Sequence, residues 1–287
     1  MGKVKIVTDS TAYLPDEMIE HLGISVVPLL VNHEEDSFPE NRDGDYHLFY
    51  TKLANSEKVP TTSQPPTGEF FEKYQQLTED GSAIISIHLS GDLSGTVQSA
   101  RTAAVMLPGR DISVVDSRFT VSAMLHIVQE AAEMAKAGYS KEDILEKINF
   151  MQKHTRLFFL VESLQYLHRG GRIGGAAALF GTLLQIKPIL VVDEGMIKVY
   201  QKVRTKERAM QVIADEVESE IKKGRCQDFR IAVIHVDNPE GAESLKSLLQ
   251  QKQPELKPDT FFVGPVIGSH VGPGSIGISI TRVGQDS

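Results

Sequence analysis

The chain has 287 residues, enough for two domains of ordinary size, and its 41% hydrophobic and 24% charged composition is that of a folded globular protein. A formal net charge of −8 argues against a general nucleic-acid-binding surface. The one cysteine, Cys226, excludes an internal disulfide framework and fits a reducing compartment. The apolar runs are too short to span a bilayer and the N-terminus shows no signal peptide, so we expect a cytoplasmic protein with at most transient membrane contact.

Strands and helices alternate along the first half of the chain. We expect strands at residues 3–7, 24–31, 82–88 and 111–115, and an irregular loop at 33–42. Helices are expected from Pro15 to Gly23 and at residues 45–54, 67–77, 94–107 and 122–137. Ser140 and Asp143 form a capping-box-like start for one more helix. This alternation predicts a Rossmann-like α/β domain with a parallel sheet.

The second half predicts a mixed sheet. Residues 186–192 and 196–203 flank a good hairpin turn, and further strands are expected at 156–161, 229–236, 261–267 and 275–281. Helices are expected at residues 163–169, 173–184 and 205–223, and after Asn238-Pro239. We therefore predict two α/β domains: residues 1–155, and residues 156–287 with a mixed sheet.

Two hydroxyl-rich stretches, residues 61–65 and 93–96, are expected where helices begin. Backbone N–H groups and the positive end of a helix dipole lie there, and with the hydroxyls of Thr62, Ser63 and Ser94 they can bind an anion. Gly95 lets a ligand approach the backbone. Ordinary helix capping is the competing explanation, stronger for Thr62 and Ser63 and about equal for Ser94, which follows a buried strand.

His270 lies in a glycine-rich stretch, residues 268–274, that we expect to be a loop. Packing explains such a histidine poorly, and an imidazole there can hydrogen-bond a carboxylate. The Gly-x-Gly-x-x-Gly match at residues 272–277 leads into a strand instead of a helix, so it does not predict a dinucleotide site. No spacing of cysteine or histidine indicates a metal, and we expect no cofactor.

Two basic clusters are ambiguous. Arg169 and Arg172 surround a Gly-Gly turn. The simpler interpretation is that they lie in solvent at a helix end, and the alternative is that they bind an anion. Four cations, Lys202, Arg204, Lys206 and Arg208, lie at an expected helix start, which is unfavourable for the helix dipole. A solvated face is the simpler reading, and a docking surface for an acidic partner is the alternative.

Taken together, these stretches resemble the DegV family of bacterial fatty-acid-binding proteins. The ordered set covers the whole chain: residues 8–10, 62–65, 93–96, 116–117, 169–173, 187–188 and 270–274. Val97 stands where family members often carry tyrosine, which affects packing near the head group and removes no expected ligand contact.

The resemblance implies one buried long-chain fatty acid, such as palmitate, with its carboxylate held by Thr62 and Ser94 and with His270 close by. Ser63 and Gly95 belong to the same stretches. The resemblance also implies presentation of the acid to a separate ATP-dependent fatty acid kinase, whose docking surface we would seek around Arg204. Apolar candidates for the acyl tunnel, for which ordinary core packing is the simpler reading, are Phe158, Phe159, Leu179, Phe180, Leu183 and Leu184.

Two other functions are weighed against a non-catalytic carrier. A hydrolase or acyltransferase would use Ser94 with His88 or His270, although the tight Gly-x-Ser-x-Gly turn is absent. A regulatory DNA-linked role is disfavoured by the net charge of −8 and by the lack of a basic stripe.

Overall fold

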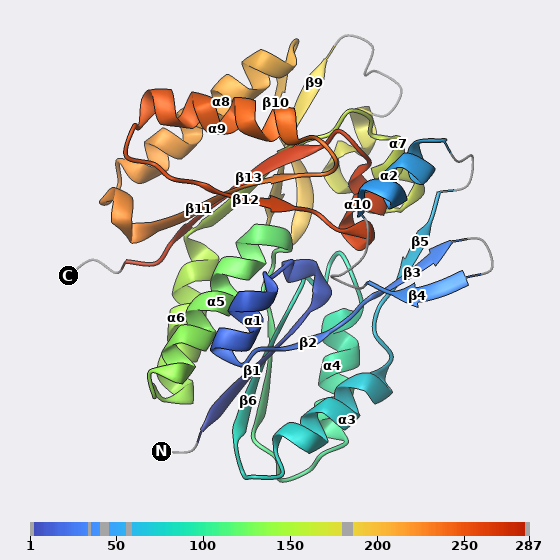
Figure 1. The fold of residues 1–287 in the computed structure, drawn as a ribbon, viewed down its shortest axis with the longest axis vertical. Helices are drawn as coiled ribbons and strands as arrows, with labels where there is room; N and C mark the ends of the chain where they lie inside the picture. Colours follow the sequence, from blue (N-terminus) through green and yellow to red (C-terminus); the bar gives the residue numbers. More distant parts are fainter. Residues whose placement is uncertain (1–2, 34–35, 41–45, 56–58, 180–185, 285–287) are drawn as a thin grey trace.

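The computed structural model describes residues 3–33, 36–40, 46–55, 59–179 and 186–284 (Figure 1). A four-stranded parallel sheet has the order β2-β1-β6-β7. Its strands are β1 (Val4–Asp9), β2 (Ser25–Val27), β6 (Ala83–His88) and β7 (Ile112–Asp116). The predicted α/β class and the parallel sheet of the first half are confirmed.

Helices cover both faces of this sheet. On one face, α3 (Thr67–Leu77) and α4 (Thr96–Val105) bury Phe70 and Ala100 against Ile84. The next residue of β6, Ile85, points to the opposite face, because side chains alternate along a strand. That face is covered by α1 (Asp16–Leu22) and α5 (Val121–Lys136). The helix α6 (Lys141–Lys153) begins with the predicted capping box of Ser140 and Asp143, which is confirmed.

The second half forms a six-stranded mixed sheet with the order β10-β9-β8-β13-β11-β12. Its strands are β8 (Thr155–Leu160), β9 (Lys187–Asp193), β10 (Met196–Val203), β11 (Phe229–His235), β12 (Asp259–Phe262) and β13 (Ile276–Arg282). The predicted hairpin is confirmed, because β9 and β10 pair antiparallel. The helices α8 (Lys206–Ile221) and α9 (Pro239–Lys252) cover one face.

The two large sheets share α5. This helix packs against β1 on one side and against β8, β11 and β13 on the other, so one apolar core continues from sheet to sheet. All strands of the parallel sheet precede residue 155, and all strands of the mixed sheet start there or later. Division into independent domains at this residue stays a prediction.

A small antiparallel sheet, β4-β3-β5, lies beside the parallel sheet. It contains β3 (Leu30–His33), β4 (Asp36–Pro39) and β5 (Thr61–Ser63), with α2 (Tyr46–Asn55) between the last two in the chain. One continuous strand over residues 24–31 was a wrong expectation: Pro28 separates β2 from β3 and cannot donate to a ladder. The expected loop at residues 33–42 contains β4. The first three residues of the hydroxyl-rich stretch at 61–65 form β5, and α3 begins shortly after the stretch, at Thr67.

The region after β12 differs most from the sequence-based expectation. The strand ends at Phe262, and Gly264-Pro265 starts a short helix, α10 (Pro265–Val271), which carries His270. Both the expected strand to residue 267 and the expected loop at 268–274 are therefore wrong in part. After α7 (Gln165–Arg169), a 3-10 helix spans Gly174–Leu179 where an α-helix was predicted, and residues 180–184 of that prediction lie outside the described residues.

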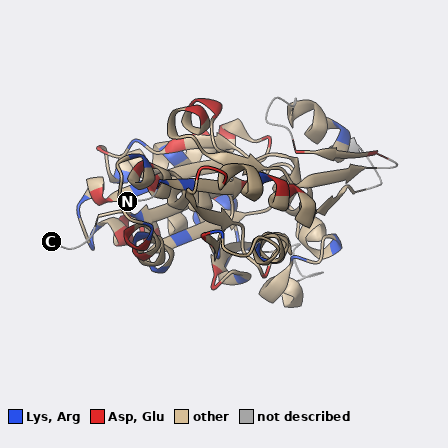
Figure 2. Cartoon of the chain, turned by 90° about the horizontal axis from the view of Figure 1, so that it is seen from below, with Lys and Arg blue, Asp and Glu red and all other residues tan. Residues whose placement is uncertain are grey.

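Acidic and basic residues are mixed over the surface elements (Figure 2). None of the helices in the described ranges has the length and apolar character needed to cross a bilayer.

One buried carboxylate fixes α10 against the first half of the chain. Glu40, which is 3% exposed, accepts hydrogen bonds from the Ser10 hydroxyl at 2.6 Å, the Tyr13 hydroxyl at 3.0 Å and the Val266 amide at 2.7 Å. Tyr50 donates its hydroxyl to the carbonyl oxygen of Gly264 at 2.7 Å. The position of α10 thus depends on residues more than 200 positions away in the sequence.

The buried Glu40 predicts a specific pH dependence of stability. Burial raises its pKa, and the hydrogen bonds from Ser10, Val266 and Tyr13 offset only part of this rise, so that the pKa moves from 4.5 to about 7. Its contribution to the free energy of unfolding is therefore complete below pH 4.5 and is lost as the pH rises through 7. The free energy of unfolding in urea should fall less between pH 4.5 and about 7 for Glu40→Gln than for the wild type. The exposed control Glu79→Gln should show the same fall as the wild type. An equal slope in all three proteins would contradict the assignment.

Candidate site: a cavity with a polar end

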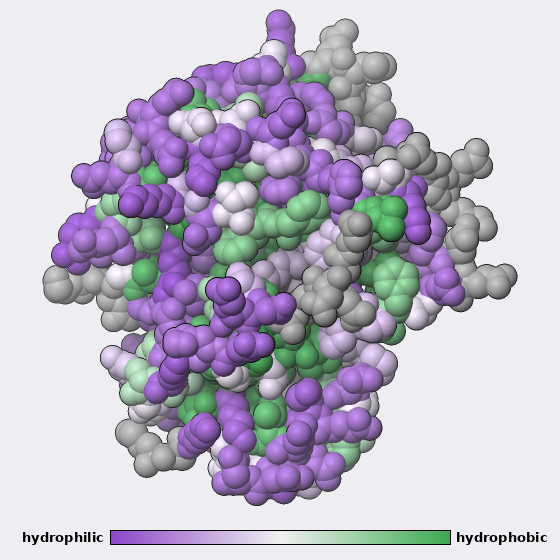
Figure 3. Space-filling model, viewed as in Figure 1, coloured by the Kyte–Doolittle hydropathy of each residue, from purple (hydrophilic) through white to green (hydrophobic). Residues whose placement is uncertain are grey.

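A cavity of about 400 Å³ lies between the two large sheets, at the carboxyl ends of the parallel strands. The loops after β6 and β7 contribute Leu93 and Thr120, and the face of the mixed sheet opposite α8 and α9 contributes Phe159 and Ile234. Ligands of open α/β sheets bind at this edge, and small-molecule pockets range from roughly 300 to 1,000 Å³. Patches of apolar side chains gather near the middle of this face of the molecule (Figure 3).

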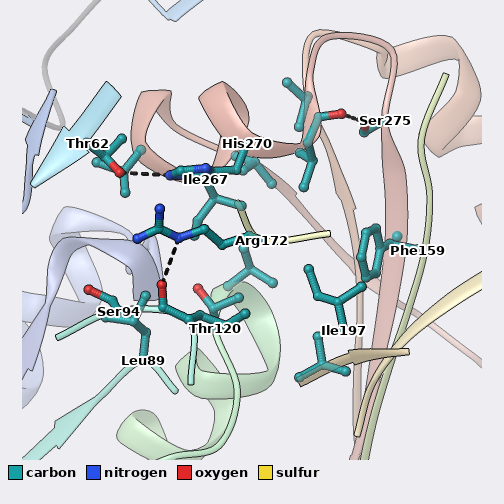
Figure 4. A pocket seen from close by; sticks show the side chains of 18 of the residues that line it. Thr62, Leu89, Ser94, Thr120, Phe159, Arg172, Ile197, Ile267, His270 and Ser275 are labelled. Atoms are coloured by element: carbon teal, nitrogen blue, oxygen red, sulfur yellow. Dashed lines mark hydrogen bonds between the residues drawn. The ribbon is translucent and has the colours of Figure 1, made fainter. Parts of the chain in front are cut away.

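Thr62 and His270 meet at one end of the cavity. The Thr62 hydroxyl lies 2.8 Å from Nε2 of His270, although the two residues are 208 positions apart (Figure 4). β5 carries Thr62 and α10 carries His270. The pairing of β5 with β3 and the anchoring of α10 by Glu40 bring them together.

The His270 imidazole is uncharged at neutral pH. Burial, together with the smaller effect of the nearby positive charge of Arg172, lowers its pKa to about 4. Its Nδ1 atom is buried and has no hydrogen-bond partner in the structure. A neutral imidazole still has one N–H to donate, so His270 can bind a carboxylate oxygen without carrying charge.

Ser94 lies two residues before α4 and lines the same cavity. Its hydroxyl is 2.9 Å from the Thr96 hydroxyl and accepts weakly from the Thr96 amide at 3.3 Å. The N-cap residue, Gly95, offers no side chain to the first turn of α4, so N–H groups of that turn stay available. The predicted combination of a hydroxyl and a helix start is present at Ser94.

Gly95 also has a packing role, which no local sequence pattern predicts. A Cβ atom at this position would lie 2.0 Å from Oε1 of Gln64, whose amide donates to Ser99 at 2.9 Å. Glycine therefore lets the segment with Thr62, Ser63 and Gln64 lie directly against the start of α4. All of these residues except Ser99 line the cavity.

Arg172 supplies the positive charge at this end of the cavity. Its Nε donates to the carbonyl oxygen of Leu93 at 3.1 Å, and its Nη1 donates to that of Gly170 at 2.6 Å. In Figure 4, it lies between the Thr62–His270 pair and the side chains of Ser94 and Thr120. Arg172 bonds the C-cap carbonyl of α7, as the simpler reading of a helix end expects, but its side chain is half-buried instead of solvated and also lines the cavity.

The other walls of the cavity are mostly apolar, with Ser275 and His235 among the lining residues. Phe159, Ile197 and Ile267 line it, and in Figure 4 Phe159 and Ile197 lie on the side away from Thr62. Of the proposed tunnel residues, Phe159 is a lining residue, while Phe158 points to the α8–α9 side of the sheet. Leu179 is buried but does not line the cavity, and the other three, Phe180, Leu183 and Leu184, lie outside the described residues.

Arg204 is exposed and does not line the cavity. It lies at the turn between β10 and α8, next to Lys206, whose Nζ lies 2.6 Å from Oε1 of Glu162. A Cβ atom at Gly274, in the turn after α10, would lie 2.7 Å from Cγ of Glu162. Glu162 therefore connects the basic run to the segment that follows His270.

The serine–histidine pairs that catalysis by Ser94 would need are not formed. The hydroxyl of Ser94 bonds to Thr96, and His88 is fully buried between Ser86 at 2.6 Å and Asp9 at 3.0 Å. His88, Ser86 and Asp9 are all 0% exposed, so a substrate cannot reach them. Across the described residues, there is no cluster of three or more histidine, cysteine or acidic side chains able to hold a metal ion.

Replacement of Gly170 should disturb the polar end of the cavity. A Cβ atom there would lie 2.3 Å from Nδ1 of His270, so Gly170→Ala should displace the ring from Thr62 at a cost of roughly 1–3 kcal/mol. Gly68→Ala is the control, because nothing lies within 4 Å of its Cβ position on α3. Urea unfolding and the NMR shifts of His270 test this. Equal stability of the two variants would show that the ring is not held as described.

Comparison with known proteins identifies one family along the whole chain. The model of the DegV family, described as an uncharacterised protein family, matches residues 3–283. A DegV domain-containing protein of Listeria innocua is 40% identical over 278 residues, which cover 96% of this chain and 98% of the relative. Protein DegV of Bacillus subtilis is 38% identical over 276 residues, with coverage of 96% and 98%.

Solved structures agree with this result. A DegV family protein from Thermus thermophilus, described by its fatty acid binding, has a TM-score of 0.90 and 32% identity, covering 98% of this chain and 99% of its own. DegV from Bacillus subtilis, described as a fatty acid binding protein, has a TM-score of 0.90 and 37% identity, with coverage of 98% and 100%. The chain therefore belongs to the DegV family.

Proposed function

We propose that this protein binds one long-chain fatty acid, with the carboxylate at Thr62, Ser94 and His270 and the acyl chain along the apolar walls. The observation that carries the proposal is the cavity itself, which is polar at one end and mostly apolar elsewhere. The descriptions of the Thermus thermophilus and Bacillus subtilis DegV structures as fatty acid binding support it.

The polar end fits a carboxylate. Removing that charge from water costs several kcal/mol unless hydrogen bonds and opposite charge replace the solvent. The hydroxyls of Thr62 and Ser94 and the imidazole of His270 offer hydrogen bonds, and Arg172 offers a positive charge. Ser63 and Gly95 line the cavity beside them.

The apolar walls supply the affinity for the chain. Each buried CH₂ group contributes about 0.8 kcal/mol, so an acyl chain of palmitate length outweighs the cost of ordering it. Phe159 and Ile197 of the mixed sheet line this part of the cavity, and Ile267 of α10 lines the cavity on the same helix as His270.

The role we propose is that of a carrier without a catalytic step or cofactor, acting in the cytoplasm. The buried position of His88 and the bond between Ser94 and Thr96 disfavour the alternative of a serine hydrolase or acyltransferase. The net charge of −8 and the mixed surface charges likewise favour a lipid ligand over nucleic acid.

Removal of two hydroxyls tests the carboxylate site. Thr62→Val combined with Ser94→Ala should weaken palmitate binding about 100-fold or more, since hydrogen bonds to a charged group contribute about 1.5–3 kcal/mol each. The control, Thr102→Val with Ser244→Ala, removes two exposed helix hydroxyls and should bind as the wild type does. Calorimetric titration of delipidated protein measures both, and unchanged affinity of the first variant would refute the site.

We further propose that the protein presents its fatty acid to an ATP-dependent fatty acid kinase through the basic run around Arg204. The exposure of Arg204 and the link from Lys206 through Glu162 to the segment after His270 support this surface. Charges at the rim of an interface act mainly on the association rate.

Charge reversal tests this surface. Arg204→Glu should slow acyl-phosphate formation by the kinase several-fold, most strongly at low salt, and leave palmitate affinity unchanged. Lys257→Glu makes the same charge change at an exposed position outside the basic run and serves as the control. Equal rates with both variants would place the kinase elsewhere.

A further inference from the structure

Thr120 stands out among the lining residues, because it holds a buried hydroxyl with no partner. Its Oγ1 atom makes no hydrogen bond in the structure, and the residue is only 6% exposed. A buried hydroxyl without a hydrogen-bond partner lowers the stability of the folded protein, so such a group calls for an explanation. The side chain lines the cavity and points toward its interior beneath Arg172 (Figure 4).

The same hydroxyl also fails to cap its own helix. Thr120 is the N-cap residue of α5, a helix of 16 residues, and its side chain forms no capping hydrogen bond. At the starts of α6 and α8, by contrast, Ser140 and Thr205 accept from the amides of Asp143 and Arg208. The first-turn N–H groups of α5 therefore lack the side-chain acceptor that a threonine at this position usually supplies.

The next residue adds backbone strain at the same place. Val121 has a φ of +48°, a left-handed conformation that a β-branched side chain rarely adopts, and it also lines the cavity. Such strain persists where the surrounding structure enforces it, and it is concentrated at functional sites. An unpaired hydroxyl, an uncapped helix and a strained residue thus coincide on the cavity wall.

We propose that Thr120 is a ligand-binding residue whose hydroxyl, together with the uncapped start of α5, binds an oxygen of the carboxylate head group. An oxygen there would satisfy the buried hydroxyl and lie at the positive end of a long helix dipole. The carboxylate then bridges two helix starts, with Ser94 before α4 and Thr120 before α5. This inference rests on the proposed fatty acid binding and adds a third hydroxyl to it.

The test uses a matched pair of Thr→Val variants. Thr8 of β1 also carries a buried Oγ1 without a partner and is 0% exposed, but it does not line the cavity. Both Thr120→Val and Thr8→Val remove an unpaired hydroxyl at nearly constant volume, so neither should destabilise the ligand-free protein. Thr120→Val alone should weaken palmitate binding to delipidated protein about 10-fold or more, and Thr120→Ser should restore it.

The outcomes separate two kinds of failure. Equal palmitate affinity of Thr120→Val, Thr8→Val and the wild type would overturn the role of Thr120 and leave the proposed function standing. An equal loss of affinity in both valine variants would also overturn it, because the effect would then be structural. Failure of the wild type itself to bind palmitate or oleate would overturn the proposed function and, with it, this inference.

Discussion

The cavity depends on one buried interaction, the hydrogen bond from the Val266 amide to the carboxylate of Glu40. It fixes a helix of only seven residues, α10, whose sequence would not hold a helix by itself. Glu40 follows β4 in the small sheet, and β5 of the same sheet carries Thr62. Because α10 and β5 are both fixed to this sheet region, His270 and Thr62 meet across 208 positions of sequence. The hydroxyl of Tyr50 and the close packing of Gly268 against it hold the helix further.

From this arrangement the electrostatics of the polar end follow. Burial and the charge of Arg172 keep His270 neutral, so the positive charge comes from an arginine that is already bonded to two backbone carbonyl oxygens. The fold already fixes the hydroxyls and helix starts around it, so little free energy is needed to rearrange them when an anion binds. Thr120 differs from these groups, because its hydroxyl has no hydrogen-bond partner in the ligand-free protein. An oxygen atom of a ligand would supply one.

Local signals in the sequence were sufficient for much of the fold. Ser140 and Asp143 predicted the start of α6, and Asn238-Pro239 that of α9, because caps act within a few residues. The helix α10 was missed because its stability comes from distant groups, chiefly Glu40 and Tyr50, which no local pattern reveals. The structure places Thr62, Ser94 and His270 in one cavity, as the resemblance implied, although their roles toward a ligand stay proposals. Thr120 was missed because an unpaired hydroxyl and a left-handed valine are features of three-dimensional packing, and no residue spacing in this chain encodes them.

Native mass spectrometry of the purified protein, followed by solvent extraction of any bound molecule, is the most direct test of fatty acid binding. We expect one long-chain fatty acid per chain, released on extraction and replaced when palmitate or oleate is added to the delipidated protein. A ligand-free mass that remains so after incubation with both acids would contradict fatty acid binding, and the cavity would then have to serve a smaller anion.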